Sequence, residues 1–222
     1  MNRTEILIGK ENLNKLKNSN IAIFGVGGVG GYTTEMLVRA GIENITIVDF
    51  DNVDKSNLNR QIIALTSTIG QPKVEVMKNR ILDINPNCNV NAINCRYTEE
   101  NSEKLLNQNY DYVIDAIDSV NDKINLIVEC KKKEIPIISA MGAGNRIGIP
   151  NFKITDISKT FNDGLAKVVR KRLKNENISK LDVAFCEDLP VTKGEVTGSI
   201  SYFPSMCGCV ISAYVIEKLI NR

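Results

Sequence analysis

The stretch Ile21-Ala22-Ile23-Phe24-Gly25-Val26-Gly27-Gly28-Val29-Gly30 decides the fold, because an apolar, strand-like run enters a glycine-rich turn. A helix is predicted from about residue 29 to 40, and Gly41 marks its end. Gly25, Gly27 and Gly30 give the spacing Gly-x-Gly-x-x-Gly, with Gly28 inside it. Such a turn lets a phosphate approach the backbone, and the helix N-terminus supplies N–H donors. We therefore predict a nucleotide-binding unit; a tight turn without a ligand is the alternative.

Strand-like and helix-like segments alternate along the next part of the chain. Further strands are predicted at 45–48, 90–93, 112–117 and 136–140, and helices at 71–84 and 120–133. This alternation predicts an α/β fold with a Rossmann-like, mainly parallel sheet that carries helices on both faces. The pattern changes after about residue 141, where Gly142, Gly144, Gly148 and Pro150 make a loop-rich transition. We predict one domain over 1–222, with a core of about 1–145 and a smaller C-terminal elaboration at 146–222. That elaboration is expected to pack on the sheet and to contain helices at about 163–174 and 206–220.

The composition excludes several classes of chemistry. The 222 residues have a formal net charge of +2 and contain no His, which excludes Ser-His-Asp and Cys-His catalysis and a His general base. The six cysteines include no Cys-x-x-Cys pair, so we predict reduced thiols. At Cys186 an unreactive thiol is favoured, and a reactive one is the alternative. The N-terminus lacks the apolar core of a signal peptide, and no stretch approaches the roughly 20 apolar residues of a membrane span. We predict a cytoplasmic protein with no membrane partner.

Charged residues follow the predicted strands, at the edge where ligands bind in open α/β sheets. Asp49 ends the second strand, where a carboxylate can accept hydrogen bonds from ribose hydroxyls. NAD, FAD and ATP all fit so far. Arg60 and Lys73 would offset the charge of a nucleoside triphosphate, whereas ordinary surface cations are the alternative. Asp118 ends the fourth strand, where it could hold Mg²⁺ against phosphate oxygens or cap the next helix.

These motifs together resemble the adenylating core of ubiquitin-activating-type enzymes, over roughly residues 3–145. The resemblance rests on the glycine turn and on Asp49-Phe50-Asp51, Ser56-Asn57-Leu58-Asn59-Arg60-Gln61, Gly70-Gln71-Pro72-Lys73 and Asp115-Ala116-Ile117-Asp118. It implies ATP and Mg²⁺ as cofactors. By this resemblance the nucleotide-binding residues are Gly25, Gly27, Gly28, Gly30, Asp49 (ribose), Asp51, Asn57, Arg60, Gln61 and Lys73 (the last four for the phosphates), with Asp118 for Mg²⁺.

A narrower resemblance covers nearly the whole chain. Arg3-Thr4-Glu5-Ile6-Leu7-Ile8-Gly9, Asp156-Ile157-Ser158-Lys159-Thr160 and Gly198-Ser199-Ile200-Ser201 are similar to the tRNA threonylcarbamoyladenosine dehydratase family. In that family, ATP activates the carboxylate of the threonyl group on a modified adenosine of tRNA, and loss of water closes a ring. The implied catalytic residues are Arg3, Arg60, Lys73 and Asp118. The resemblance also implies a homodimer, in which Arg3 reaches the partner subunit's ATP site, and it allows a sulfur-transfer protein partner.

The predicted helix at 163–174 is strongly basic. Its cations Lys167, Arg170, Lys171 and Lys174 recur on one face, and its apolar stripe is Leu165, Val168, Val169 and Leu173. Such a face can bind RNA phosphates by charge, and the resemblance favours tRNA; a solvated helix face is the alternative. Two other functions stay open. One is activation of the C-terminus of a ubiquitin-like sulfur carrier, and the other is a redox or regulatory nucleotide-binding protein.

Overall fold

A seven-stranded sheet forms the centre of the computed structural model, which describes residues 2–192 and 197–221. The strands are β1 (Asn20–Phe24), β2 (Asn44–Asp49), β3 (Asn89–Asn94), β4 (Tyr112–Asp115), β5 (Ile137–Ala140), β6 (Phe152–Asp156) and β7 (Asp182–Cys186). Their order is β3-β2-β1-β4-β5-β7-β6. Neighbouring strands pair in parallel, except that β6 runs antiparallel to β7 at the edge. The predicted α/β fold with a mainly parallel sheet is confirmed.

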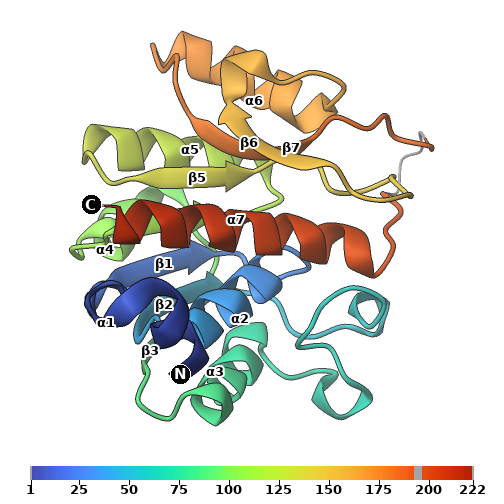
Figure 1. Ribbon diagram of the computed structural model, residues 1–222. Helices are drawn as coiled ribbons and strands as arrows, with labels where there is room; N and C mark the ends of the chain where they lie inside the picture. Colours follow the sequence, from blue (N-terminus) through green and yellow to red (C-terminus); the bar gives the residue numbers. More distant parts are fainter. Residues whose placement is uncertain (1, 193–196, 222) are drawn as a thin grey trace.

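Helices cover both faces of the sheet (Figure 1). One face carries α1 (Asn2–Asn18), α2 (Gly30–Ala40), α3 (Lys73–Ile84) and α7 (Tyr202–Ile220). The opposite face carries α4 (Glu99–Leu106), α5 (Val120–Lys132) and α6 (Gly164–Asn175). Short 3-10 helices lie at Lys55–Asn57, Thr66–Thr68 and Ile157–Lys159.

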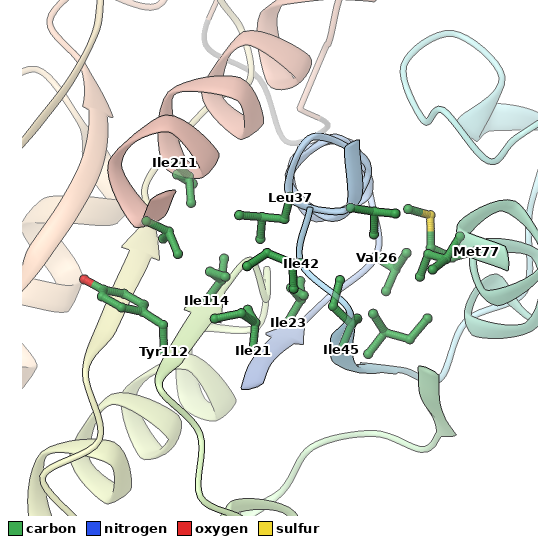
Figure 2. Packing of buried hydrophobic residues seen from close by; sticks show 14 of the residues in the cluster. Ile21, Ile23, Val26, Leu37, Ile42, Ile45, Met77, Tyr112, Ile114 and Ile211 are labelled. Atoms are coloured by element: carbon green, nitrogen blue, oxygen red, sulfur yellow. The ribbon is translucent and has the colours of Figure 1, made fainter. Parts of the chain in front are cut away.

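Alternate residues of the strands face the two helical layers. Ile21 and Ile23 of β1 point toward Leu37 of α2 and Ile211 of α7, and all four side chains are fully buried (Figure 2). Phe24, also fully buried, belongs to the cluster on the opposite face. Because side chains alternate along a strand, this two-sided burial fixes the register of the sheet. The carboxyl ends of the parallel strands therefore meet at one edge.

Residues after 145 extend the sheet and do not simply pack on it. β7 pairs in parallel with β5, and β6 then closes this edge of the sheet. No strand is predicted in this region from sequence. The residues of β6 are mostly half-buried and show no clean alternation, because β6 is an edge strand with one neighbour.

The last helix begins at Tyr202, earlier than the predicted start near Met206. Pro204 lies in its first turn, where the missing backbone N–H is tolerated. Among the described helices, α7 alone is long and apolar enough to span a membrane by length and composition. Phe203, Cys207 and Ile211 are nevertheless fully buried in the fold, so α7 packs as a core helix against α2 and the sheet.

Candidate active site

A cavity of about 690 Å³ opens at the carboxyl edge of β1, β2, β4 and β5. It brings together nine of the predicted site residues: Gly25, Gly27, Gly28, Asp49, Asp51, Arg60, Gln61, Lys73 and Asp118. Another part of its wall consists of residues 141–144, Leu165 and Ser199. The cavity lies where ligands bind in open α/β sheets, as the sequence predicts.

The glycine turn packs closely against the start of the loop after β4. Gly25 has a φ of +92°, and a Cβ there would lie 2.5 Å from the backbone oxygen of Ala116. A Cβ at Gly30 would lie 1.8 Å from the Gly25 oxygen, which explains why Gly30 is required although it does not line the cavity. At Gly27, in contrast, the nearest atom to a Cβ would be the Gln61 amide nitrogen, 3.7 Å away. The backbone is therefore open at Gly27, where a phosphate can approach.

Asp49 fastens the glycine turn to the end of β2. Its Oδ2 accepts a hydrogen bond from the Val26 N–H at 2.7 Å, and its Oδ1 accepts one from the Asp51 N–H at 2.9 Å. Each carboxylate oxygen can accept a further hydrogen bond. The side chain is half-buried and lines the cavity, so this geometry fits the predicted contact with ribose hydroxyls.

Two predicted cations, Lys73 and Arg60, line the cavity together with carboxylates such as Asp49 and Asp51. Lys73, the first residue of α3, is 6% exposed, and its Nζ lies 2.7 Å from Oδ2 of Asp51. Arg60 donates through one guanidinium nitrogen to the Ser56 carbonyl oxygen and to Oδ1 of Asn59, each at 2.9 Å. The rest of the Arg60 fork has no hydrogen-bond partner among the described residues. These cations fit a polyanionic ligand such as a nucleoside triphosphate.

Gln61 places a buried amide beside the glycine turn. The residue is 7% exposed, and its Oε1 is the one buried side-chain oxygen or nitrogen of the described residues without a hydrogen-bond partner. Buried polar atoms are nearly always paired in folded proteins. The Gln61 amide lies beside Gly27 and lines the cavity. A donor on a ligand would satisfy Oε1, whereas the Gln61 Nε2 beside Gly27 can donate to a phosphate.

Asn57 and Arg3 do not line the cavity. Asn57 is buried in a capping box, in which its Oδ1 accepts a hydrogen bond from the Asp54 N–H at 3.0 Å and Asp54 accepts one from Ser56. Asn57 therefore shapes the 3-10 helix that leads to Arg60. Arg3 is exposed on α1, away from the cavity lining of its own chain.

Asp118 is exposed and lines the cavity immediately after β4. Ser119, and not Asp118, is the N-cap of α5, and it makes no side-chain cap hydrogen bond. The alternative of a capping carboxylate is therefore not what the structure shows. No group of three His, Cys, Asp or Glu side chains able to hold a metal occurs within residues 2–192 and 197–221. Magnesium at Asp118 would therefore need phosphate oxygens as additional ligands.

Two aromatic residues that line the cavity, Phe50 and Tyr97, are not among the site residues predicted from sequence. Phe50 is 54% exposed, and the Arg96 guanidinium lies 5.8 Å from its ring centroid. Arg96 also forms an ion pair with Asp122 at 2.8 Å, and Tyr97 packs edge-on against Phe24. Arg96 and Tyr97 come shortly after the end of β3. Their place at the carboxyl edge of a predicted strand is the feature of the sequence that could have marked them as cavity residues.

A fully buried charge network lies beneath the cavity floor. Lys123 of α5 donates from Nζ to Oδ2 of Asp115 at 2.8 Å, to the Ala140 carbonyl oxygen at 3.1 Å and to Ser139 Oγ at 3.3 Å. Ser139 also donates to Asp115, whose other oxygen accepts from the Ile117 N–H at 3.1 Å. The network joins the ends of β4 and β5. The residues that follow these two strands, 116–119 and 141–144, line the cavity.

The basic helix α6 differs from its predicted arrangement. Lys167, Lys171 and Lys174 are exposed, but Arg170 is half-buried and donates to the Thr160 carbonyl oxygen at 3.0 Å and to the Ile157 carbonyl oxygen at 3.3 Å. Arg170 therefore does not belong to an exposed cationic face. Val168 is 44% exposed, so the buried stripe is Ala166, Val169 and Leu173.

The thiol of Cys186 has the features of an inert cysteine. It is buried at the end of β7 and donates to Asp188 at 3.0 Å. Burial raises the pKa of Cys186, and the Asp188 carboxylate raises it further. Reactive cysteines need a lowered pKa, so these contacts support the predicted unreactive thiol.

Comparison with known proteins matches the ThiF family over residues 1–222. The tRNA threonylcarbamoyladenosine dehydratase of Bacillus subtilis (strain 168) is 44% identical, over 99% of this chain and 94% of that protein. The crystal structure of E. coli tRNA N6-threonylcarbamoyladenosine dehydratase in complex with ATP has a TM-score of 0.95 and 36% identity, over 99% of this chain and 93% of that chain. A molybdopterin-synthase adenylyltransferase from Haemophilus influenzae is more distant, at 33% identity over 72% of this chain and 65% of that protein. The chain therefore belongs to the ThiF family, and its resemblance to the tRNA threonylcarbamoyladenosine dehydratases is confirmed.

Proposed function

We propose that this protein is an ATP-dependent dehydratase that cyclises N6-threonylcarbamoyladenosine in tRNA through adenylation of the threonyl carboxylate. The similarity to dehydratases extends over nearly the whole chain, including one solved with ATP. The observation that carries the proposal is the open backbone of Gly27 beside the Gln61 amide nitrogen, with Arg60 and Lys73 on the same cavity.

The chemistry suits a chain without His. A carboxylate is already a nucleophile, so its attack on an α-phosphate needs no general base, and the protein mainly supplies positioning and charge stabilisation. Arg60, Gln61 and Lys73 are the residues that we propose to bind the phosphates, and Asp49 the residue that binds the ribose. Asp51 holds the Lys73 ammonium in place. Exposed Asp118 can hold Mg²⁺ together with phosphate oxygens.

AMP formation separates this function from activation of a ubiquitin-like sulfur carrier. The protein is incubated with labelled ATP and either modified tRNA or candidate carrier proteins. The proposed function predicts AMP with tRNA, whereas AMP formed only with a carrier protein would contradict it. Tight binding of NAD without binding of ATP would exclude both. A sulfur-transfer protein partner stays a prediction, as does action in the cytoplasm.

The exposed lysines of α6 form the tRNA-binding face that we propose, without Arg170. Replacing Lys167, Lys171 and Lys174 with Gln should weaken tRNA binding and flatten the dependence of log Kd on log salt by about 2–3 units. Filter binding across a salt series measures this slope. The matched control, Lys10→Gln with Lys78→Gln, changes two cations of helices on the opposite face of the sheet. An unchanged slope in the α6 variant would show that these lysines do not bind tRNA phosphates and form an ordinary solvated helix face.

We also propose a homodimer in which Arg3 acts in the partner subunit's site. The exposed position of Arg3 outside its own cavity supports this arrangement. Arg3→Ala and Lys73→Ala subunits should each be nearly inactive alone, and mixing them should restore activity, because one site of each mixed dimer is intact. A lack of restoration, after subunit exchange has been verified by mass spectrometry, would exclude action in trans.

A further inference from the structure

Phe161 presents an aromatic ring at the edge of the sheet where the cavity opens. Its side chain is 50% exposed, and its ring packs edge-on against buried Phe185 of β7, with ring centroids 5.6 Å apart at 74°. Phe185 lies next to the carboxyl end of β7. The contact fixes the ring orientation and leaves half of the side chain open to solvent.

The turn that carries Phe161 is tied to the cavity wall. Buried Arg146 donates to the Asn162 carbonyl oxygen at 3.2 Å and to the Gly142 carbonyl oxygen at 2.7 Å. Asp163 accepts a hydrogen bond from the Gly142 N–H at 2.9 Å and caps α6 at the Ala166 N–H. Gly142 lines the cavity, so the Phe161 turn and the cavity wall form one hydrogen-bonded unit.

Exposed cations continue from this turn along α6. Leu165, in the first turn of the helix, lines the cavity, and Lys167 and Lys171 follow it on the exposed surface. Arg170 links α6 to this turn by donating a hydrogen bond to the Thr160 carbonyl oxygen. An exposed ring in the turn before a helix with exposed lysines offers the two features with which proteins bind unpaired nucleotides, namely stacking on the base and attraction of the backbone.

We propose that Phe161 is a base-stacking platform for an unpaired RNA nucleotide that neighbours the nucleoside in the cavity. The proposal rests on the proposed tRNA substrate and adds a contact that neither the motifs nor the cavity lining includes. Stacking on an aromatic ring is independent of base identity, so Phe161 contributes affinity and placement of the RNA without reading its sequence.

The test compares Kd for tRNA that carries N6-threonylcarbamoyladenosine among four variants. Phe161→Ala should raise Kd about 10- to 100-fold. Phe161→Leu retains an apolar contact with Phe185 and should bind as weakly, whereas Phe161→Trp should restore affinity. Val168→Ala, which truncates another exposed apolar side chain on α6, should bind as the unchanged protein does. Thermal unfolding of each variant shows whether the fold is retained.

The salt dependence of Kd distinguishes a stacking contribution to tRNA binding from an electrostatic one. The Phe161→Ala defect should be the same factor at low and high salt, with an unchanged slope of log Kd against log salt, because stacking releases no counterions. Affinity in Phe161→Leu equal to that of the unchanged protein would overturn the proposal, as would an altered slope in Phe161→Ala. Product formation by the unchanged protein reports on the proposed function separately. If it forms no cyclic product, the function itself is wrong and the stacking proposal falls with it.

Discussion

Replacing Lys73 with alanine should lower kcat by about 10²–10³-fold, the usual effect of removing one preorganised donor that stabilises charge in the transition state. Lys73 is 6% exposed, so little solvent weakens its field at the cavity. Its partner Asp51 is 48% exposed and can be solvated when the ammonium is removed, so the fold should be retained. The measurement is the rate of AMP formation with tRNA at saturating ATP, together with the thermal unfolding temperature.

Lys55→Ala provides the matched control, because Lys55 is an exposed cation on the neighbouring 3-10 helix outside the cavity lining. It should retain nearly full activity. Arg60→Ala should resemble Lys73→Ala in magnitude, since both cations line the same cavity. Near-normal turnover in either variant would show that the phosphates are oriented differently.

Replacing Lys123 with methionine should lower the free energy of unfolding by about 3–5 kcal/mol, the usual penalty for leaving one partner of a buried ion pair without its counter-charge. Both Lys123 and Asp115 are fully buried, so no water can solvate the carboxylate that remains. Urea unfolding followed by circular dichroism measures the change.

The control removes both charges together. Lys123→Met combined with Asp115→Asn leaves an uncharged acceptor for the Ile117 N–H and should recover most of the lost stability, because neutral replacements of buried ion pairs are often well tolerated. A loss below about 1 kcal/mol in Lys123→Met alone, the range of exposed pairs, would show that the pair contributes no more than a surface ion pair does.

The elements around the nucleotide motifs could be predicted because short-range patterns specify them. The glycine turn, Asp49 at the end of β2 and the cations Arg60 and Lys73 follow each other along the chain, and the parallel sheet gathers them at one edge. Asn57 was predicted to bind phosphate but lies in a capping box, since an asparagine at this spacing serves either role.

The parts that escaped prediction depend on tertiary packing. β6 and β7 carry only short strand-like runs in the sequence, and their place in the sheet depends on the pairing of β7 with β5. Arg170 follows buried Ala166 by one helical turn, which places it at the border of the buried stripe and within reach of Thr160.

Lys123 is a buried residue whose role was not predicted from the sequence, although its position in α5 gave a signal. It precedes Leu126, Ile127 and Cys130 at helical spacing, so it occupies the apolar face of α5, and all four residues are fully buried. A lysine on such a face requires a buried carboxylate, which Asp115 at the end of the preceding strand supplies, although Asp118 and Asp122 lie nearer along the chain. Periodicity therefore contained the signal, but its partner could be recognised only once β4, β5 and α5 were packed together.

Mass spectrometry of tRNA nucleosides tests the central claim most directly. The protein is incubated with ATP, Mg²⁺ and tRNA that carries N6-threonylcarbamoyladenosine, and the digested nucleosides and released AMP are quantified together. The proposed function predicts that the modified nucleoside loses the mass of one water while AMP forms in equal amount, and that Lys73→Ala slows both changes by about 10²–10³-fold. An unchanged nucleoside, with AMP formed only when a carrier protein is supplied, would contradict it.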